Sequence, residues 1–175
     1  IPPLQQMTHA LKHLSDGLPV IDSVHILSHG KPGAMVFDAS VINSQKLKEN
    51  SSRLRLWQKY LRKEAGIFIY GCDIAQNKDF MRTFENTLQR NIWASENKTG
   101  CINRDADWIF EYPTIQKQKI LPTTIESAYS YQLEITSETT IDFEGGVHGE
   151  YIDYIGSIHF SGYYYTQQGE SLFVR

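Results

Sequence analysis

The stretch VHILSHGKPG at residues 24–33 decides how this chain is interpreted, because an apolar run ends there at a histidine followed by a glycine. A second apolar run, IFIY at residues 67–70, ends in a similar way at Gly71 and Cys72. Short apolar runs bounded by glycine are typical of buried strands in a parallel sheet. His29 and Cys72 therefore each follow the carboxyl end of a predicted strand, which is where open parallel sheets bind their ligands.

Helical patterns separate these predicted strands. Residues 3–15 carry leucine and methionine at spacings of three and four, which predicts a helix, and similar patterns cover residues 43–63 and 75–90. Short strands are predicted at residues 91–95 and 106–112. Helices that alternate with short apolar strands predict an α/β fold, in which a mainly parallel sheet is flanked by helices on both faces.

The gross composition excludes several classes of protein. The chain has 175 residues, 41% of them hydrophobic and 21% charged, which is ordinary for a globular domain. With a net charge of −3, the chain lacks the excess of positive charge that is typical of proteins that bind nucleic acid. No window approaches the run of about 18 apolar residues that a membrane span needs.

The composition changes toward the C-terminus. Residues 1–133 are predicted to form the α/β domain, whereas residues 134–175 alternate aromatic or β-branched residues with polar ones between glycine turns. This alternation predicts a β-rich segment of antiparallel strands. About 40 residues of strand bury too little surface to be stable alone, so the segment either packs on the α/β domain or begins a second β domain.

The two strand ends can form one chemical site. Right-handed crossover places strands that are one βα unit apart side by side, so His29 and Cys72 can share a crevice. An imidazole beside a thiol raises the population of the nucleophilic thiolate. The main-chain amides of Gly30 and Cys72 could then stabilise an oxyanion. The alternative is that Cys72 is a small buried apolar residue and His29 an ordinary hydrogen-bonded histidine.

A run that ends in His-Gly, followed by a run that ends in Gly-Cys, resembles the caspase-like (clan CD) cysteine peptidases. More closely, HILSHGKPGAM, IFIYGCDIA, ASENKTG and DWIFE, in this order, resemble a bacterial domain family of unknown function. Its members occur toward the N-termini of very large secreted or surface repeat proteins, and the resemblance covers about residues 4–133. It implies a caspase-like fold and a location outside the bacterial cell.

The resemblance also implies roles for individual residues. His29 and Cys72 correspond to the catalytic dyad, and the amides of Gly30 and Cys72 to the oxyanion hole. Ser95, Glu96 and Asn97 follow the third strand, where these peptidases line their main specificity pocket with backbone. Two departures stand out, because the strands that usually precede the first helix are missing here, and RDADW at residues 104–108 replaces a glycine-containing loop.

Several other residues have two possible roles. Asp73 either caps the helix predicted to begin at residues 73–75 or faces a substrate pocket. His25 shares a strand face with His29 and is either its partner or a core histidine. Cys101 is either a bystander or the partner of Cys72 in a disulfide that would silence the site.

No cofactor is expected. Carboxylates near a glycine turn leave calcium as one possibility, with the candidate ligands Asp142, Glu144 and Asp153, but EF-hand spacing is absent. Histidine and cysteine do not occur at zinc-ligand spacing.

The sequence thus predicts a cysteine endopeptidase that cuts its own parent chain or a partner protein, with a basic residue before the cleaved bond. Asp73, beside the nucleophile, is the reason for expecting a basic side chain. The main alternative is a catalytically silent caspase-like domain that serves as a structural or attachment module. A third possibility, a carbohydrate-binding β module, rests on the tyrosine-rich stretch at residues 154–166.

Overall fold

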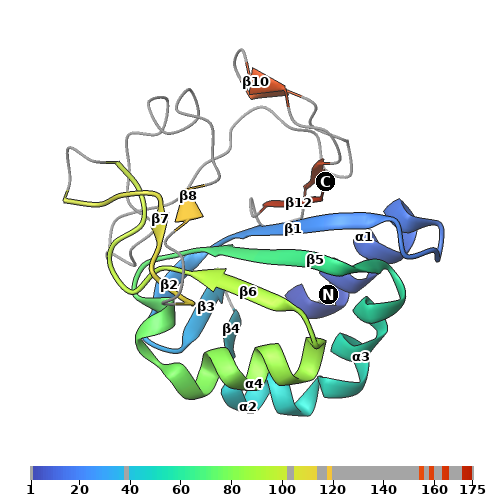
Figure 1. The fold of residues 1–175 in the computed structure, drawn as a ribbon, viewed down its shortest axis with the longest axis horizontal. Helices are drawn as coiled ribbons and strands as arrows, with labels where there is room; N and C mark the ends of the chain where they lie inside the picture. The colour runs from blue at the N-terminus through green and yellow to red at the C-terminus, as the bar shows by residue number, and fades with distance from the viewer. Residues whose placement is uncertain are drawn as a thin grey trace.

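A computed structural model of the chain describes residues 2–37, 40–101, 105–113 and 118–119, together with short strands within residues 154–174 (Figure 1). Its main sheet has the strand order β11-β12-β1-β5-β6. The strands are β1 (Ile21–Leu27), β5 (Leu61–Tyr70), β6 (Asn91–Ala94), β11 (Tyr163–Tyr165) and β12 (Ser171–Val174). β1 runs parallel to β5 and β5 parallel to β6, whereas β12 pairs antiparallel with β1 and β11 antiparallel with β12. The described residues therefore form a mixed α/β fold with a mainly parallel centre.

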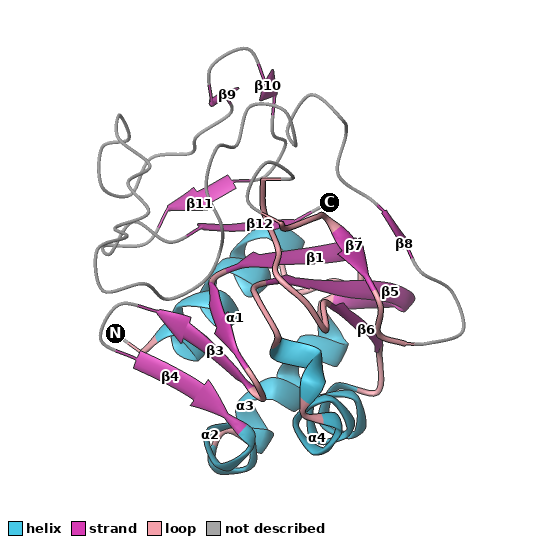
Figure 2. Cartoon of the chain, turned by 90° about the vertical axis from the view of Figure 1, so that its left-hand side faces the viewer, coloured by secondary structure: helices cyan, strands magenta, loops and turns pink. Residues whose placement is uncertain are grey.

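A second, antiparallel sheet lies beside the main one (Figure 2). It consists of β2 (His29–Lys31), β3 (Ala34–Phe37) and β4 (Ser40–Asn43), paired in the order β2-β3-β4. Apolar periodicity did not predict these short strands, but the Pro-Gly pair at residues 32–33 is a turn signal. The turn exists at residues 32–33, where Gly33 has a φ of 74°, and it closes a hairpin that carries His29.

The helices are α1 (Pro3–Ser15), α2 (Ser44–Glu49), α3 (Ser51–Arg55), the 3₁₀ helices η1 (Leu56–Lys59) and η2 (Ile74–Gln76), and α4 (Lys78–Leu88). The prediction for residues 3–15 is confirmed. The predicted helix over residues 43–63 is wrong in its continuity and its end, because the segment is divided at Asn50 and β5 begins at Leu61. Likewise, the predicted helix over residues 75–90 is shorter, because Asn77 caps α4 with its side chain and Gln89 ends it in a left-handed conformation.

All four α-helices of the described residues pack on one face of the sheet. Figure 1 shows α2, α3 and α4 below the strands, and α1 joins the same layer, where the Trp57 indole donates a hydrogen bond to the Thr8 hydroxyl at 2.8 Å. Strand residues that point to this face, such as Ile26, Ile67 and Ile69, belong to one continuous apolar core with the helices. Burial of this core is the main stabilising term of the fold.

The opposite face carries an aromatic cluster in place of helices. It is formed by Phe68, Tyr70, Cys72, Trp108 and Phe110, with Leu27 and Trp93 packed against it. Trp108 and Phe110 reach it from the segment around β7 (Ile109–Phe110), which pairs antiparallel with β8 (Gln118–Lys119). The prediction of helices on both faces is therefore wrong for the described residues, because the Phe68 and Tyr70 side chains of β5 pack against other aromatic rings on this face.

The predicted antiparallel pairing near the C-terminus is found where the structure describes that region. β9 (Tyr154–Ile155) pairs antiparallel with β10 (Ile158–His159), and β12 joins the main sheet beside β1. Among the residues described, no helix has the length and apolar character needed to cross a membrane.

Candidate functional site

The strands that precede His29 and Cys72 are direct neighbours. β1 and β5 pair in parallel with Leu27 opposite Tyr70, and the Ser28 amide continues the ladder by donating to the Tyr70 carbonyl at 3.0 Å. The two strands therefore end at the same level. This register brings the His29–Gly30 and Gly71–Cys72 segments to one edge of the sheet, as right-handed crossover predicted.

Gly30 lies directly against the backbone of the cysteine turn. A Cβ atom at Gly30 would stand 2.2 Å from the Cys72 carbonyl oxygen and 2.5 Å from the Cys72 nitrogen. Gly71 is also close, because a Cβ atom there would lie 3.3 Å from the Gly30 Cα. Only glycine at position 30 allows the two chain segments to approach so closely. The residues predicted to supply the oxyanion amides are thus in contact through their main chains.

The Cys72 side chain is fully buried, with 0% of its surface exposed. The Thr99 amide donates to the Cys72 sulfur at 3.3 Å, and the thiol can donate to the Thr99 carbonyl at 3.6 Å. A hydrogen-bond donor aimed at sulfur favours the thiolate, whereas burial among aromatic rings favours the neutral thiol. Thr99 is itself only 1% exposed, so the sulfur and this hydrogen-bond partner are both enclosed, and a substrate can reach Cys72 only after a local opening of the structure.

His29 opens β2, opposite Val36 of β3, and is half-buried. His25 is a core histidine that belongs to the aromatic face. Its Nδ1 lies 3.0 Å from the Tyr70 hydroxyl, its Nε2 lies 3.1 Å from the Ser23 hydroxyl, and its ring stacks on Phe68. Burial raises the pKa of Tyr70 well above its ordinary value, so the phenol stays neutral and able to donate.

The three residues predicted to bind substrate pack against the turn that follows Cys72. The Asn97 carbonyl accepts from the Asp73 amide at 2.8 Å, and the Ser95 carbonyl accepts from the Ala75 amide at 2.9 Å. The Glu96 carbonyl accepts from the side chain of Gln76 at 3.0 Å. These carbonyls already have partners within the chain, so an incoming peptide strand would have to replace those hydrogen bonds.

Asp73 does not cap a helix, so that prediction is wrong. The residue has a φ of 61° in the left-handed region and makes no side-chain capping bond to η2. α4 begins later and is capped by Asn77, which accepts from the amides of Asp79 and Phe80. The Asp73 carboxylate instead accepts from the Gln76 side chain at 2.7 Å. Among the described residues, no helix of useful length points its amides at Cys72, so no helix dipole favours a thiolate there.

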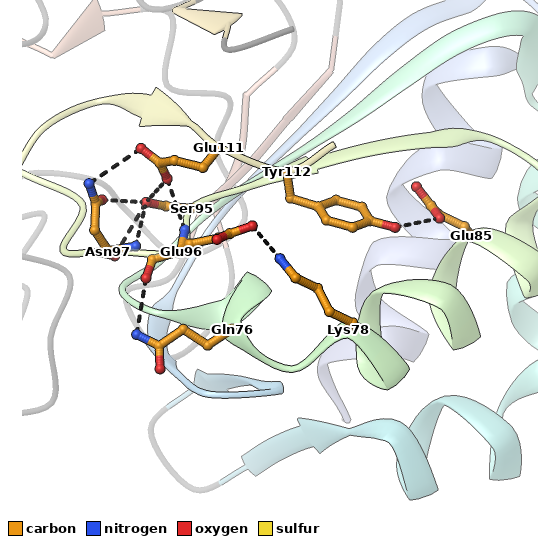
Figure 3. Close-up of polar contacts among 8 residues, drawn as sticks. All are labelled: Gln76, Lys78, Glu85, Ser95, Glu96, Asn97, Glu111 and Tyr112. Carbon is orange, nitrogen blue, oxygen red and sulfur yellow. Dashed lines mark hydrogen bonds and ion pairs between the residues drawn. The ribbon is translucent and has the colours of Figure 1, made fainter. Parts of the chain in front are cut away.

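Glu111 is the residue that sequence reasoning missed at this site (Figure 3). Its carboxylate lies 3.0 Å from the Ser95 hydroxyl, accepts from the Glu96 amide at 2.9 Å, and accepts from the Asn97 side chain at 3.3 Å. Asn97 also donates to Asp107 at 3.3 Å. Its place at the end of DWIFE could have pointed to it, because DWIFE is the fourth motif of the family resemblance and the sequence analysis gave that motif no role.

A third group of contacts joins this network to α4. Lys78 forms an ion pair with Glu96, and its ammonium group lies 5.2 Å from the centre of the Tyr112 ring. Tyr112 exchanges main-chain hydrogen bonds with Ala94 and donates its phenol to Glu85 at 2.8 Å (Figure 3). The main chain next to Glu111 is therefore attached to β6 through Tyr112, and the Tyr112 phenol attaches it to α4.

We expect Tyr112 to make the domain sensitive to alkali. Burial, and then the Glu85 carboxylate, raise the pKa of Tyr112 to about 12, above the value of roughly 10 in an unfolded chain. The folded state thus binds this proton more tightly, so the resulting stability is complete below about pH 10 and is lost as the pH rises toward about 12. Glu85→Gln should lower this pKa, and Tyr112→Phe should remove the transition from a spectroscopic titration of tyrosinate. An unchanged titration in Tyr112→Phe would contradict the assignment.

Cys101 is half-buried, and both cysteines are free thiols, so the disulfide that the sequence left as an alternative is not formed in this structure. Within the described residues there is no group of three or more histidine, cysteine or acidic side chains that could hold a metal ion. The possible calcium ligands Asp142, Glu144 and Asp153 lie outside the described residues.

The burial of Cys72 predicts a difference in labelling between the two thiols. In the native protein, a bulky maleimide should modify Cys101 at least about tenfold faster than Cys72, because Cys72 must wait for a local opening of the Thr99 segment. Mass spectrometry of timed samples measures both rates, and denaturant should bring them together. Equal rates in the native state would show that Thr99 does not cover the sulfur.

Comparison with known proteins identifies a family but no activity. A family model described as "Domain of unknown function (DUF4347)" matches residues 2–134. No curated protein and no solved structure matches the chain significantly. Residues 2–134 include all four motifs, so the match covers both strand ends and the Glu111 network.

Proposed function

We propose that this chain, which belongs to the DUF4347 family of domains of unknown function, is a cysteine endopeptidase with a caspase-like fold and a His29–Cys72 dyad. The observation that supports this most is the contact of Gly30 with the Cys72 main chain, where a side chain of any size is excluded. A structural cysteine does not need a neighbouring strand end to approach so closely. A dyad does need it, because base and nucleophile must share a substrate.

In the proposed reaction, the Cys72 thiolate attacks the carbonyl carbon of the scissile peptide bond. His29 takes the thiol proton and passes it to the amine as the C–N bond breaks. The acyl group stays on Cys72 as a thioester. Water then hydrolyses the thioester with His29 as the base. The amides of Gly30 and Cys72 are the proposed donors to the oxyanion in both steps.

The reaction requires the Thr99 segment to move. The Thr99 amide and carbonyl both lie within hydrogen-bond distance of the sulfur, and in the proposed reaction a substrate carbonyl would have to displace them. The proposed enzyme therefore cleaves only while this segment is open, which suits a domain that cuts its parent chain or a partner protein once. A location outside the bacterial cell is part of the same proposal and follows from the family resemblance.

The charge around the cysteine turn supports a basic residue before the cleaved bond. The carboxylates of Asp107 and Glu111 both accept from Asn97, and Asp73 lies next to the nucleophile. Lys78 pairs with Glu96, and Lys31 and Lys98 supply further opposing charge in the neighbouring stretches of sequence, so the proposal rests on the position of Asp73 beside the nucleophile and not on net charge. A peptide library digested by the protein should show cleavage after Arg or Lys, and the activity should vanish in Cys72→Ser. A preference for Asp, Leu or small residues would overturn the specificity.

A silent domain is the second candidate, because one observation favours it. Cys72 is fully buried and packs with Trp108 and Phe110, as a purely structural cysteine would. In that case the domain would serve as a structural or attachment module. The two candidates differ in whether the reactivity of Cys72 depends on His29, since a structural cysteine has no reason to respond to that histidine.

A further inference from the structure

We infer that Glu111 is a positioning residue for Cys72, acting through the Ser95–Asn97 loop, and this inference rests on the proposed function for its catalytic consequence. Neither the sequence analysis nor the proposed reaction assigns a role to Glu111, although it is the last residue of the DWIFE motif. It lies outside the dyad and is not a proposed oxyanion donor. Its contacts nevertheless lead to the cysteine in two steps.

The first step joins Glu111 to the loop. The carboxylate faces the Ser95 hydroxyl, the Glu96 amide and the Asn97 side-chain amide, all between 2.9 and 3.3 Å. Ser95 is buried, and its hydroxyl also lies 2.6 Å from the Asn97 side-chain oxygen. A carboxylate that accepts from several donors fixes their relative positions, and hydrogen bonds to a charged group are among the stronger ones in proteins.

The second step joins the loop to the turn after the cysteine. The carbonyls of Asn97 and Ser95 accept from the amides of Asp73 and Ala75. Asp73 needs such support, because its φ of 61° is unfavourable for a residue with a side chain. The amide of Cys72, which is the proposed oxyanion donor, directly precedes this turn. A loosened loop therefore misplaces the donor and the sulfur together.

Glu111→Gln provides a graded test of the first step. Glutamine keeps a carbonyl oxygen that can accept from the Glu96 amide, but it places an NH₂ group toward the NH₂ of Asn97. Glu111→Ala removes all the contacts. Glu85→Gln is the matched control, because it removes a carboxylate from the same region that accepts a hydrogen bond from Tyr112 instead of from the loop (Figure 3).

The experiment compares amide hydrogen exchange and peptide cleavage in the whole chain. Exchange at Asp73 and Ala75 should accelerate by about tenfold or more in Glu111→Ala, less in Glu111→Gln, and remain unchanged in Glu85→Gln. Cleavage should fall by about a hundredfold in kcat/KM, with both kcat and KM affected, because the loosened Ser95–Asn97 loop carries proposed substrate-binding residues and also supports the turn after Cys72.

Unchanged exchange at Asp73 and Ala75, or an equal acceleration across β1 and β5, would overturn the inference, because Glu111 would then be irrelevant or merely stabilising. If Glu111→Ala does not fold, the exchange of Glu111→Gln decides the matter alone. Absence of cleavage by the wild-type protein would overturn the proposed function, whereas the exchange data would still test the link from Glu111 to the cysteine turn.

Discussion

Alanine in place of Gly30 is expected to lower the free energy of unfolding by about 3 kcal/mol, the upper range of overpacking effects. The new methyl group would meet the Cys72 carbonyl oxygen at 2.2 Å, the Cys72 nitrogen at 2.5 Å and the Gly71 carbonyl carbon at 2.6 Å. All three atoms are backbone, so no side chain can rotate away to make room. The hairpin that carries His29 must therefore separate from β5, and the dyad would be lost with it.

Gly17→Ala is the matched control for this substitution. Gly17 has a φ of 76°, but a Cβ atom there would meet no atom within 4 Å. The change thus imposes only the backbone cost of a left-handed alanine, roughly 1 kcal/mol. Denaturant unfolding of both variants measures the difference, with Gly30→Ala clearly the more damaging. Equal effects would mean that the strand ends do not pack as closely as described.

The largest effect on activity is expected from the dyad itself. Cys72→Ser should abolish peptide cleavage, a loss of about 10⁴-fold or more, because a serine hydroxyl in this setting is a far weaker nucleophile than a thiolate. His29→Ala should cost a comparable factor, and the double variant should be little worse than either one, since the two groups act as a unit. Initial rates on a cleavable peptide measure all three variants.

Cys72→Ser is preferable to Cys72→Ala because of Thr99. The serine oxygen can still accept from the Thr99 amide, whereas alanine leaves that buried amide without its sulfur acceptor, at a cost of roughly 1 kcal/mol or more. Full activity in Cys72→Ser, with the fold intact, would remove Cys72 as the nucleophile.

The sequence predicted the centre of the fold because its signals there are local. The apolar runs of β1 and β5, each ended by glycine, and the right-handed crossover rule placed His29 and Cys72 at one edge of the sheet. The α1 helix was equally clear from its periodicity. The Cys72 turn was predicted less well, because Asp73 looks like a helix cap in sequence and adopts a left-handed conformation in the structure.

The features that were missed depend on tertiary contacts. The run at residues 67–70 is apolar on both faces, so it cannot reveal that helices cover one face and aromatic rings the other. In β5 the first residue, Leu61, is followed by Arg62, Lys63 and Glu64, a charged and exposed stretch that continues the apparent helix before it. Glu111 follows a strand, and nothing in its neighbours along the chain points to Ser95 or Asn97.

The pH dependence of Cys72 alkylation, measured in a Cys101→Ala background with and without His29→Ala, tests the central claim most directly. Opening of the Thr99 segment sets the absolute rate, whereas ionisation of the thiol sets how the rate changes with pH. If His29 and Cys72 form a dyad, iodoacetamide should react well below pH 8, and His29→Ala should shift the profile up toward the value of about 8.5 for an ordinary thiol. Superimposable profiles, both with the midpoint of an ordinary thiol, would contradict the dyad and leave Cys72 as a structural residue.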